Sequence, residues 1–179
     1  MLNKKRVFHV SVLLFLIGIL TACQTTSKPI LAAEMHPAAT IFLVRHAEKT
    51  SDKTDPPLTT EGRQRAERLA DMLGDANITR VYSSDYKRTR DTGAPLAKHL
   101  GMEVQLYDAG DLEAIAERLI AEGGRTLVVG HSNTTPQLVE LLGGEGGEPI
   151  VEATEYNRLY IVTLGHDGEV STTLLRYGD

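Results

Sequence analysis

Short apolar runs alternate with segments of helical periodicity from Thr40 onward, and this alternation constrains the fold more than any other feature. The apolar runs predict strands at 40–44, 79–83, 103–107 and 126–129, with a closing hairpin at 158–164 and 170–175. The segments between them predict helices that begin near Thr59 or Thr60, near Asp85, after Asp111 and at Thr134. Strands that alternate with helices favour a mainly parallel sheet with helices on both faces. We therefore expect an α/β domain, a three-layer α/β/α sandwich.

The first strand and the first helix show the two patterns clearly. The run TIFLV at 40–44 is apolar throughout, as a strand buried on both faces requires. In the helix that follows, Ala66, Leu69, Ala70 and Leu73 recur at intervals of three and four residues and form one apolar face. Gly74 is expected to end this helix.

Residues 1–22 have the pattern of a signal peptide. Three basic residues at positions 4–6 precede an apolar run at 10–20, which is shorter than the about 20 residues that a helix needs to cross a bilayer. Leu20-Thr21-Ala22-Cys23 resembles the lipobox of bacterial lipoproteins, in which the chain is cut before the cysteine and the thiol carries lipid. Cys23 is the only cysteine, so an internal disulfide is excluded. An ordinary secretory signal with an incidental cysteine is the alternative.

A lipidated Cys23 would place the protein in the bacterial cell envelope. Gln24 after the cysteine, rather than Asp, favours the outer membrane, facing the periplasm in a Gram-negative cell. Residues 23–38 are small, polar or proline-bearing and predict a tether, followed by the domain at 39–179. Removal of the three leader charges would take the formal net charge from −5 to −8. A surface this acidic argues against nucleic-acid binding, which draws on clustered Lys and Arg.

Histidine and arginine side chains follow three of the predicted strands. Arg45-His46 follows the first strand, Arg88 lies shortly after the second, and Gly130-His131-Ser132 follows the fourth. Because active sites of such sheets gather at the carboxyl ends of the strands, we expect two histidines and two arginines to converge there. A strongly cationic pocket in an acidic protein suits a phosphoryl group, which needs several preorganised donors.

With these motifs in this order, the sequence resembles the histidine phosphatase superfamily, also called the phosphoglycerate mutase-like or RHG family. The resemblance runs from about Thr40 to Tyr177 and rests on Arg45-His46, Leu58-Thr59 with Gly62, the stretch 83–88, and Val129-Gly130-His131-Ser132. It implies that His46 is the nucleophile of a phosphatase and forms a phosphohistidine that water hydrolyses. It also implies that Arg45 and Arg88 hold the phosphoryl oxygens, that His131 adds a donor, and that no metal or other cofactor is needed.

Two positions depart from the family pattern, and a third is the candidate proton donor. Ala47 replaces the usual glycine of Arg-His-Gly, which we expect to be tolerated if φ is negative. Arg65 stands where the helix often has Gln, and we expect it to affect the surface more than the site. Asp108, after the third strand, is the candidate proton donor, and burial or a carboxylate neighbour would have to keep it protonated. The alternatives are a turn-forming Asp108, or no acid at all with substrates that have good leaving groups.

Other features of the sequence suggest two alternative functions. Residues 130–134 (GHSNT) partly resemble the nucleophile elbow of α/β-hydrolases, with Ser132 as nucleophile. Only His166 follows, directly before Asp167, so the required order of Asp and then His fails. A second alternative is a lipoprotein that only binds a phosphorylated ligand in the same pocket. The remaining histidines form no spacing that resembles a metal site.

Within the family, a phosphatase is favoured over a mutase. A mutase needs a cytoplasmic pool of phosphorylated sugar acids, and the chain lacks the long insertions with which larger mutases enclose substrate. The expected substrate is a small phosphorylated molecule, either an envelope phospho-sugar, which the location favours, or a phosphohistidine. The short loop at 52–57 predicts an open pocket with broad selectivity among phosphomonoesters.

Overall fold

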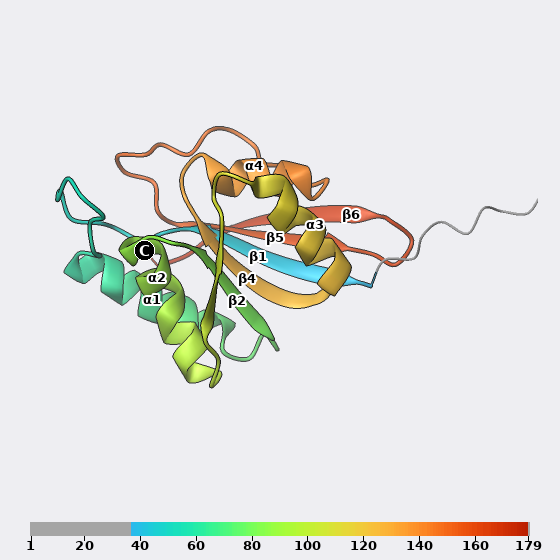
Figure 1. Ribbon diagram of the computed structural model, residues 1–179, viewed down its shortest axis with the longest axis horizontal. Helices are drawn as coiled ribbons and strands as arrows, with labels where there is room; N and C mark the ends of the chain where they lie inside the picture. The colour runs from blue at the N-terminus through green and yellow to red at the C-terminus, as the bar shows by residue number, and fades with distance from the viewer. Residues whose placement is uncertain (1–36, 179) are drawn as a thin grey trace, which may run out of the picture. The chain divides into compact units, whose positions relative to one another are not determined.

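A computed structural model describes residues 37–178 of the chain (Figure 1). The elements in this range are β1 (Ala39–Arg45), α1 (Thr60–Leu73), β2 (Arg80–Ser84), α2 (Lys87–His99), β3 (Val104–Tyr107), α3 (Leu112–Glu122), β4 (Gly124–Gly130), α4 (Thr134–Leu141), β5 (Arg158–Leu164) and β6 (Val170–Arg176). The expected leader at 1–22, Cys23 and most of the expected tether lie outside the described residues. Within 37–178, no helix is both long and apolar enough to span a bilayer.

The strands form one mixed sheet in the order β3-β2-β4-β1-β5-β6. Strands β3, β2, β4 and β1 are parallel, whereas β5 and β6 run antiparallel to their neighbours. The mainly parallel sheet and its closing hairpin are therefore confirmed. The register of β1 on β4 pairs Arg45 with Gly130, so both strands end at the same level.

Helices cover both faces of the sheet, and the three-layer sandwich is confirmed (Figure 1). Ile41 and Leu43 of β1 pack in the same core cluster as residues of α3 and α4, whereas Phe42 and Val44 pack with α1 and α2. This alternation follows from the two-residue period of a strand. Each such side chain contributes roughly 1.5–3 kcal/mol when it is fully buried, which explains why residues 41–44 of β1 are all apolar.

The helix starts show how side chains fix the loops around the site. The Thr59 hydroxyl accepts a hydrogen bond from the Gly62 amide at 3.0 Å, and the Asp111 carboxylate accepts one from the Ala114 amide at 3.1 Å, so side chains cap both helices at the predicted starts. Helix α2 begins at Lys87, two residues after the predicted start near Asp85. Its first amide, that of Lys87, donates to the Asp55 carboxylate at 2.9 Å, which joins the loop before α1 to the start of α2.

Candidate active site

His46 lies in the loop directly after β1 and is 3% exposed. Its amide donates to the Gly130 carbonyl at 2.9 Å, which extends the β1–β4 pairing by one residue. Its ring Nδ1 lies 2.8 Å from the Ala47 carbonyl oxygen. Because a carbonyl only accepts, Nδ1 carries the ring proton and Nε2 keeps a lone pair. The backbone thus fixes the tautomer that a nucleophile requires.

The surroundings of His46 keep its imidazole neutral. Burial lowers the pKa of His46 to about 3, and the positive charges of Arg45 and Arg88 and the neighbouring His131 act in the same direction. The hydrogen bond to the Ala47 carbonyl favours the protonated ring but is outweighed. At neutral pH, His46 is therefore an uncharged imidazole with a free Nε2.

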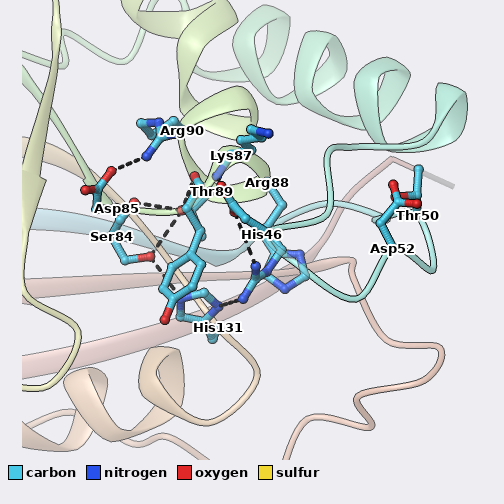
Figure 2. Close-up of polar contacts among 12 residues, drawn as sticks. His46, Thr50, Asp52, Ser84, Asp85, Lys87, Arg88, Thr89, Arg90 and His131 are labelled. Atoms are coloured by element: carbon cyan, nitrogen blue, oxygen red, sulfur yellow. Dashed lines mark hydrogen bonds and ion pairs between the residues drawn. The ribbon is translucent and has the colours of Figure 1, made fainter.

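His131 follows β4, and a chain of hydrogen bonds determines its protonation (Figure 2). The Thr89 hydroxyl donates to the Ser84 carbonyl at 2.8 Å, and the Ser84 hydroxyl donates to the Thr89 oxygen at 3.1 Å. Ser84 Oγ then accepts from His131 Nε2 at 2.9 Å, and Nδ1 accepts from Arg88 Nη2 at 3.4 Å. Burial, Arg88 and Arg45 lower the pKa of His131 to about 4. Donation from Nδ1 to a phosphoryl oxygen therefore requires a second proton on this ring.

Arg45 is the last residue of β1 and is 2% exposed. Its Nη1 donates to the Glu155 carbonyl at 3.0 Å, and its guanidinium lies 4.1 Å from the centre of the Tyr156 ring. Its Nε is buried without a hydrogen-bond partner in the described part of the chain. Burial lowers the pKa of Arg45 from its ordinary value, yet a guanidinium stays charged at neutral pH. A buried donor without a partner is costly and is what a ligand oxygen would satisfy.

Arg88 lies in the first turn of α2 and contacts one aromatic residue, Tyr86, and one acidic residue, Asp55. Its guanidinium lies 4.4 Å from the centre of the Tyr86 ring, and its Nη1 lies 3.9 Å from an Asp55 carboxylate oxygen. Its Nε, like that of Arg45, is buried without a partner among the described residues. The rings of His46 and His131 are 5.5 Å apart, edge to face. The four residues predicted from the sequence thus gather at one edge of the sheet.

A pocket of about 400 Å³ opens over these side chains. Its lining includes His46, Arg88 and His131, together with Lys49, Tyr86, Glu152 and the amino end of α4 at 132–134. The amides of a helix N-terminus add to the attraction for an anion. Arg45 is buried and is not among the residues that line the pocket. Within 37–178, no three His, Cys, Asp or Glu side chains are grouped to hold a metal ion.

The structure does not bring Asp108 into this pocket. Asp108 is exposed, and its carboxylate accepts a hydrogen bond from the Gly110 amide at 2.8 Å in the turn after β3. It lines a neighbouring hollow beside Tyr86 and Leu106. The burial that we expected to keep Asp108 protonated is absent, and the alternative interpretation, a turn-forming aspartate, matches the geometry.

Arg65 is buried and contacts the loop after β1, so the expectation that it affects mainly the surface is wrong. It is 9% exposed, and its Nε and Nη2 both lie 2.9 Å from Oε1 of Glu48. Its Nη1 donates to the Tyr177 carbonyl at 2.7 Å. Glu48 follows His46 by two residues, so Arg65 ties the end of the chain and helix α1 to the loop of the nucleophile.

Two small residues hold the same loop. A Cβ at Gly62 would lie 2.2 Å from the Glu48 carbonyl oxygen, so only glycine allows this close approach. Among the described residues, Asp55 and Asn77 are the non-glycine residues with positive φ, so Ala47 meets the condition that we set for replacing glycine. The Ala47 amide donates to the Thr92 hydroxyl at 3.0 Å, which fixes this loop against α2.

Sequence reasoning missed the contribution of the segment 143–157. Strand β5 is antiparallel to β1 and pairs Leu159 with Val44, so the residues before β5 lie beside the end of β1. This brings the Glu155 carbonyl and the Tyr156 ring to Arg45 and places Glu152 in the pocket. The sequence predicted the hairpin of β5 and β6, but it did not indicate that β5 pairs with β1.

Comparisons with known proteins agree with the motifs. Residues 41–109 match the model of the histidine phosphatase superfamily (branch 1). The probable phosphoglycerate mutase GpmB of Escherichia fergusonii is 34% identical over 73 residues, 37% of this chain and 34% of the relative. The match therefore spans about a third of that relative's length. Over these parts, the chain is similar to the histidine phosphatase superfamily.

Solved structures agree on the fold. The protein histidine phosphatase SixA complexed with tungstate is 24% identical, with a TM-score of 0.62 over 76% of this chain and 96% of that one. A mycobacterial glucosyl-3-phosphoglycerate phosphatase is 15% identical, with a TM-score of 0.55 over 79% and 99%. The phosphoglycerate mutase of Plasmodium falciparum is 18% identical, with a TM-score of 0.51 over 79% and 91%. At these identities the likeness concerns the fold alone.

Proposed function

We propose that this chain is a phosphatase of the histidine phosphatase superfamily, which hydrolyses phosphomonoesters or phosphohistidine through a phosphohistidine on His46. One observation carries the proposal. His46 is buried and neutral, and the hydrogen bond from Nδ1 to the Ala47 carbonyl leaves a lone pair on Nε2. His46 also lines a pocket that contains the cationic side chains of Lys49 and Arg88. Such a nitrogen has the lone pair, and the pocket the charge, that attack on a phosphoryl group requires.

In the first step, Nε2 of His46 bonds to phosphorus while the bond from phosphorus to the leaving oxygen or nitrogen breaks. Negative charge is spread over the three remaining phosphoryl oxygens. Arg88 lines the pocket and Arg45 precedes His46 in the chain, so their guanidinium groups would bind those oxygens; each also has a buried Nε without a partner among the described residues. Because these guanidinium groups supply the positive charge, we expect the reaction to proceed with a chelator present. In the second step, water attacks phosphorus and the bond to Nε2 breaks.

We propose further that the protein acts in the cell envelope. The leader and the lipobox-like Leu20-Thr21-Ala22-Cys23 support export and a lipid anchor on Cys23. The substrate would then be a small phosphorylated molecule of that compartment, such as an envelope phospho-sugar. Metabolic labelling with a radioactive fatty acid tests the anchor, because the label should enter the wild type and not Cys23→Ala.

The two alternatives make different demands on the same pocket. Ser132 lines the pocket but makes no hydrogen bond to a histidine within the described residues, so a serine nucleophile would lack its base. A protein that only bound a phosphorylated ligand would have no use for the fixed tautomer of His46. The observations therefore favour a nucleophilic His46 over both alternatives.

The test is hydrolysis of p-nitrophenyl phosphate by the form that starts after Cys23, with EDTA present, for the wild type and His46→Ala. We expect activity that survives EDTA in the wild type and a loss of at least about 1,000-fold in the variant, since removal of a nucleophile removes its pathway. His99→Ala, an exposed histidine outside the pocket, is the control. Activity that persists in His46→Ala would contradict the proposal. If the wild type is inactive, sugar phosphates and phosphohistidine are tested in the same way, and inactivity on all of them would favour the binding protein.

A further inference from the structure

We propose that Glu152 transfers protons in this pocket: it protonates the leaving group when His46 takes the phosphoryl group, and it accepts a proton from water when the phosphohistidine is hydrolysed. This inference rests on the proposed phosphatase function. Neither the motifs nor the strand ends point to this residue, which lies between α4 and β5.

Glu152 is the one carboxylate in the lining of the pocket among residues 37–178. The other titratable groups of the lining are His46, His131, Lys49, Arg88 and Tyr86. The negative charge of Glu152 also acts on Arg45, where it favours the protonated guanidinium. With Asp108 held in its turn outside the pocket, Glu152 is the acidic group with access to the reacting centre.

The backbone that carries Glu152 is held in place from both sides. The Val151 carbonyl accepts hydrogen bonds from the amides of Thr154 at 3.2 Å and Glu155 at 2.8 Å. The Val151 amide donates to the Glu155 carboxylate at 2.9 Å, which closes the turn. The Glu155 carbonyl accepts from Arg45. A turn fixed to the arginine beside the nucleophile positions Glu152 before substrate arrives.

Arg158 anchors the same turn in the protein interior. It is 7% exposed, and its Nε and Nη2 donate to the Glu155 carboxylate at 2.7 and 2.9 Å. Arg176 also pairs with this carboxylate. Glu155 is therefore committed to structure, whereas Glu152 is exposed and its carboxylate makes no hydrogen bond within the described part of the chain.

Glu152 alone can give and regain the one proton that the two steps require. Glu152 is exposed in the free protein, so the like charge that favours its protonated form has to come from the phosphoryl group of the bound substrate. In the first step the Glu152 carboxyl then gives its proton to the leaving oxygen as the P–O bond breaks and the P–Nε2 bond forms. In the second step the carboxylate takes a proton from the attacking water as the P–O bond to water forms and the P–Nε2 bond breaks. Inorganic phosphate leaves, and Glu152 returns to its starting state. General acid–base catalysis of this kind typically contributes about 100- to 10,000-fold.

Glu152→Gln separates this role from a structural one, with Glu145→Gln as the matched control. Glu145 is exposed on the same segment and does not line the pocket, so its variant removes the same charge. With p-nitrophenyl phosphate, whose leaving group needs little protonation, Glu152→Gln should release one equivalent of p-nitrophenol in a burst and then turn over about 100-fold more slowly. With an alkyl phosphate, the first step also slows, so the loss should be larger and the burst absent.

Two results would overturn the assignment. One is a Glu152→Gln variant that keeps the wild-type kcat on both substrates. The other is an equal fall on both substrates with no burst, which would indicate an electrostatic effect on Arg45. Either result with an active wild type and an inactive His46→Ala leaves the proposed phosphatase intact, whereas activity in His46→Ala would remove the proposed function itself.

Discussion

At the scale of single residues, the site depends on two buried histidines that stay neutral. His46 uses Nδ1–H on the Ala47 carbonyl, and His131 uses both nitrogens, one toward Ser84 and one toward Arg88. Both rings remain uncharged because protonation would place a cation in a buried site beside two arginines. His46 and His131 can therefore lie close to Arg45 and Arg88 without adding a further positive charge to the site.

This neutrality predicts how stability depends on pH. The folded pKa values of about 3 for His46 and about 4 for His131 lie below the ordinary value of 6.5. Below pH 6.5 the unfolded chain takes up protons that the folded chain does not. The contribution to stability is therefore complete above 6.5 and falls toward pH 4, by up to about 1.4 kcal/mol per pH unit for each histidine.

Urea unfolding at pH 7.5, 5.5 and 4.5 measures this dependence. The wild type should lose stability as pH falls, and His46→Asn/His131→Asn should show a flatter profile. His99→Asn, which changes an exposed histidine, should follow the wild type. Parallel profiles for the wild type and the double variant would show that the two histidines do not cause the loss.

At the scale of elements, the loop between β1 and α1 is held by backbone contacts that leave no room for adjustment. Alanine at Gly62 would gain up to about 1 kcal/mol of helix propensity, but its Cβ would meet the Glu48 carbonyl oxygen at 2.2 Å. A backbone atom has to move, so the steric effect exceeds the gain in propensity. The displaced residues would include His46, two positions before Glu48.

Gly62→Ala should therefore lower both the thermal midpoint and kcat, with kcat reduced about 100-fold because a misplaced nucleophile loses its alignment. Gln64→Ala, at an exposed position of the same helix, also introduces alanine, with a smaller gain in propensity and without the clash, and should keep full activity. Circular dichroism and initial rates on p-nitrophenyl phosphate provide the two readouts. Unchanged activity in Gly62→Ala would mean that the position of Glu48 does not set that of His46.

The elements were more predictable than their contacts. Apolar periodicity identified the strands and helices, and the parallel strand ends brought His46, Arg88 and His131 together as expected. Asp108 was misjudged because its position after β3 does not determine where its carboxylate points, and the Gly110 amide holds it in a turn. Arg65 was misjudged because its partner Glu48 is 17 residues away in the chain, a contact that no local pattern encodes.

At the scale of the whole molecule, the antiparallel β5 joins the carboxyl half of the chain to the site. Its first residue, Arg158, donates to the Glu148 carbonyl at 2.6 Å and to the Tyr160 hydroxyl at 2.9 Å, besides Glu155. One buried side chain thus holds the segment that supplies Tyr156 and Glu152. Removal of one partner from such a network typically costs about 3–5 kcal/mol because the remaining charge is left unpaired.

Arg158→Met is expected to loosen the segment 143–157 while β4 stays intact. Hydrogen exchange should accelerate at the amides of 151–155, and kcat/KM should fall as Arg45 loses the fixed Glu155 carbonyl. Arg118→Met, which removes an arginine from an exposed pair with Glu122 on α3, should leave both measurements unchanged. Exchange that rises equally in β4 would indicate general destabilisation instead of a local anchor.

The most direct test of the account is to find where the phosphoryl group resides during turnover. Rapid quench of the enzyme with p-nitrophenyl [³²P]phosphate, followed by peptide mapping, should give a label that is stable to alkali, labile to acid and attached to His46. Because dephosphorylation should be slow in Glu152→Gln, that variant should accumulate more of the label, and His46→Ala should carry none. An alkali-labile label on Ser132, or steady turnover with no phosphoenzyme at any time, would contradict a nucleophilic His46.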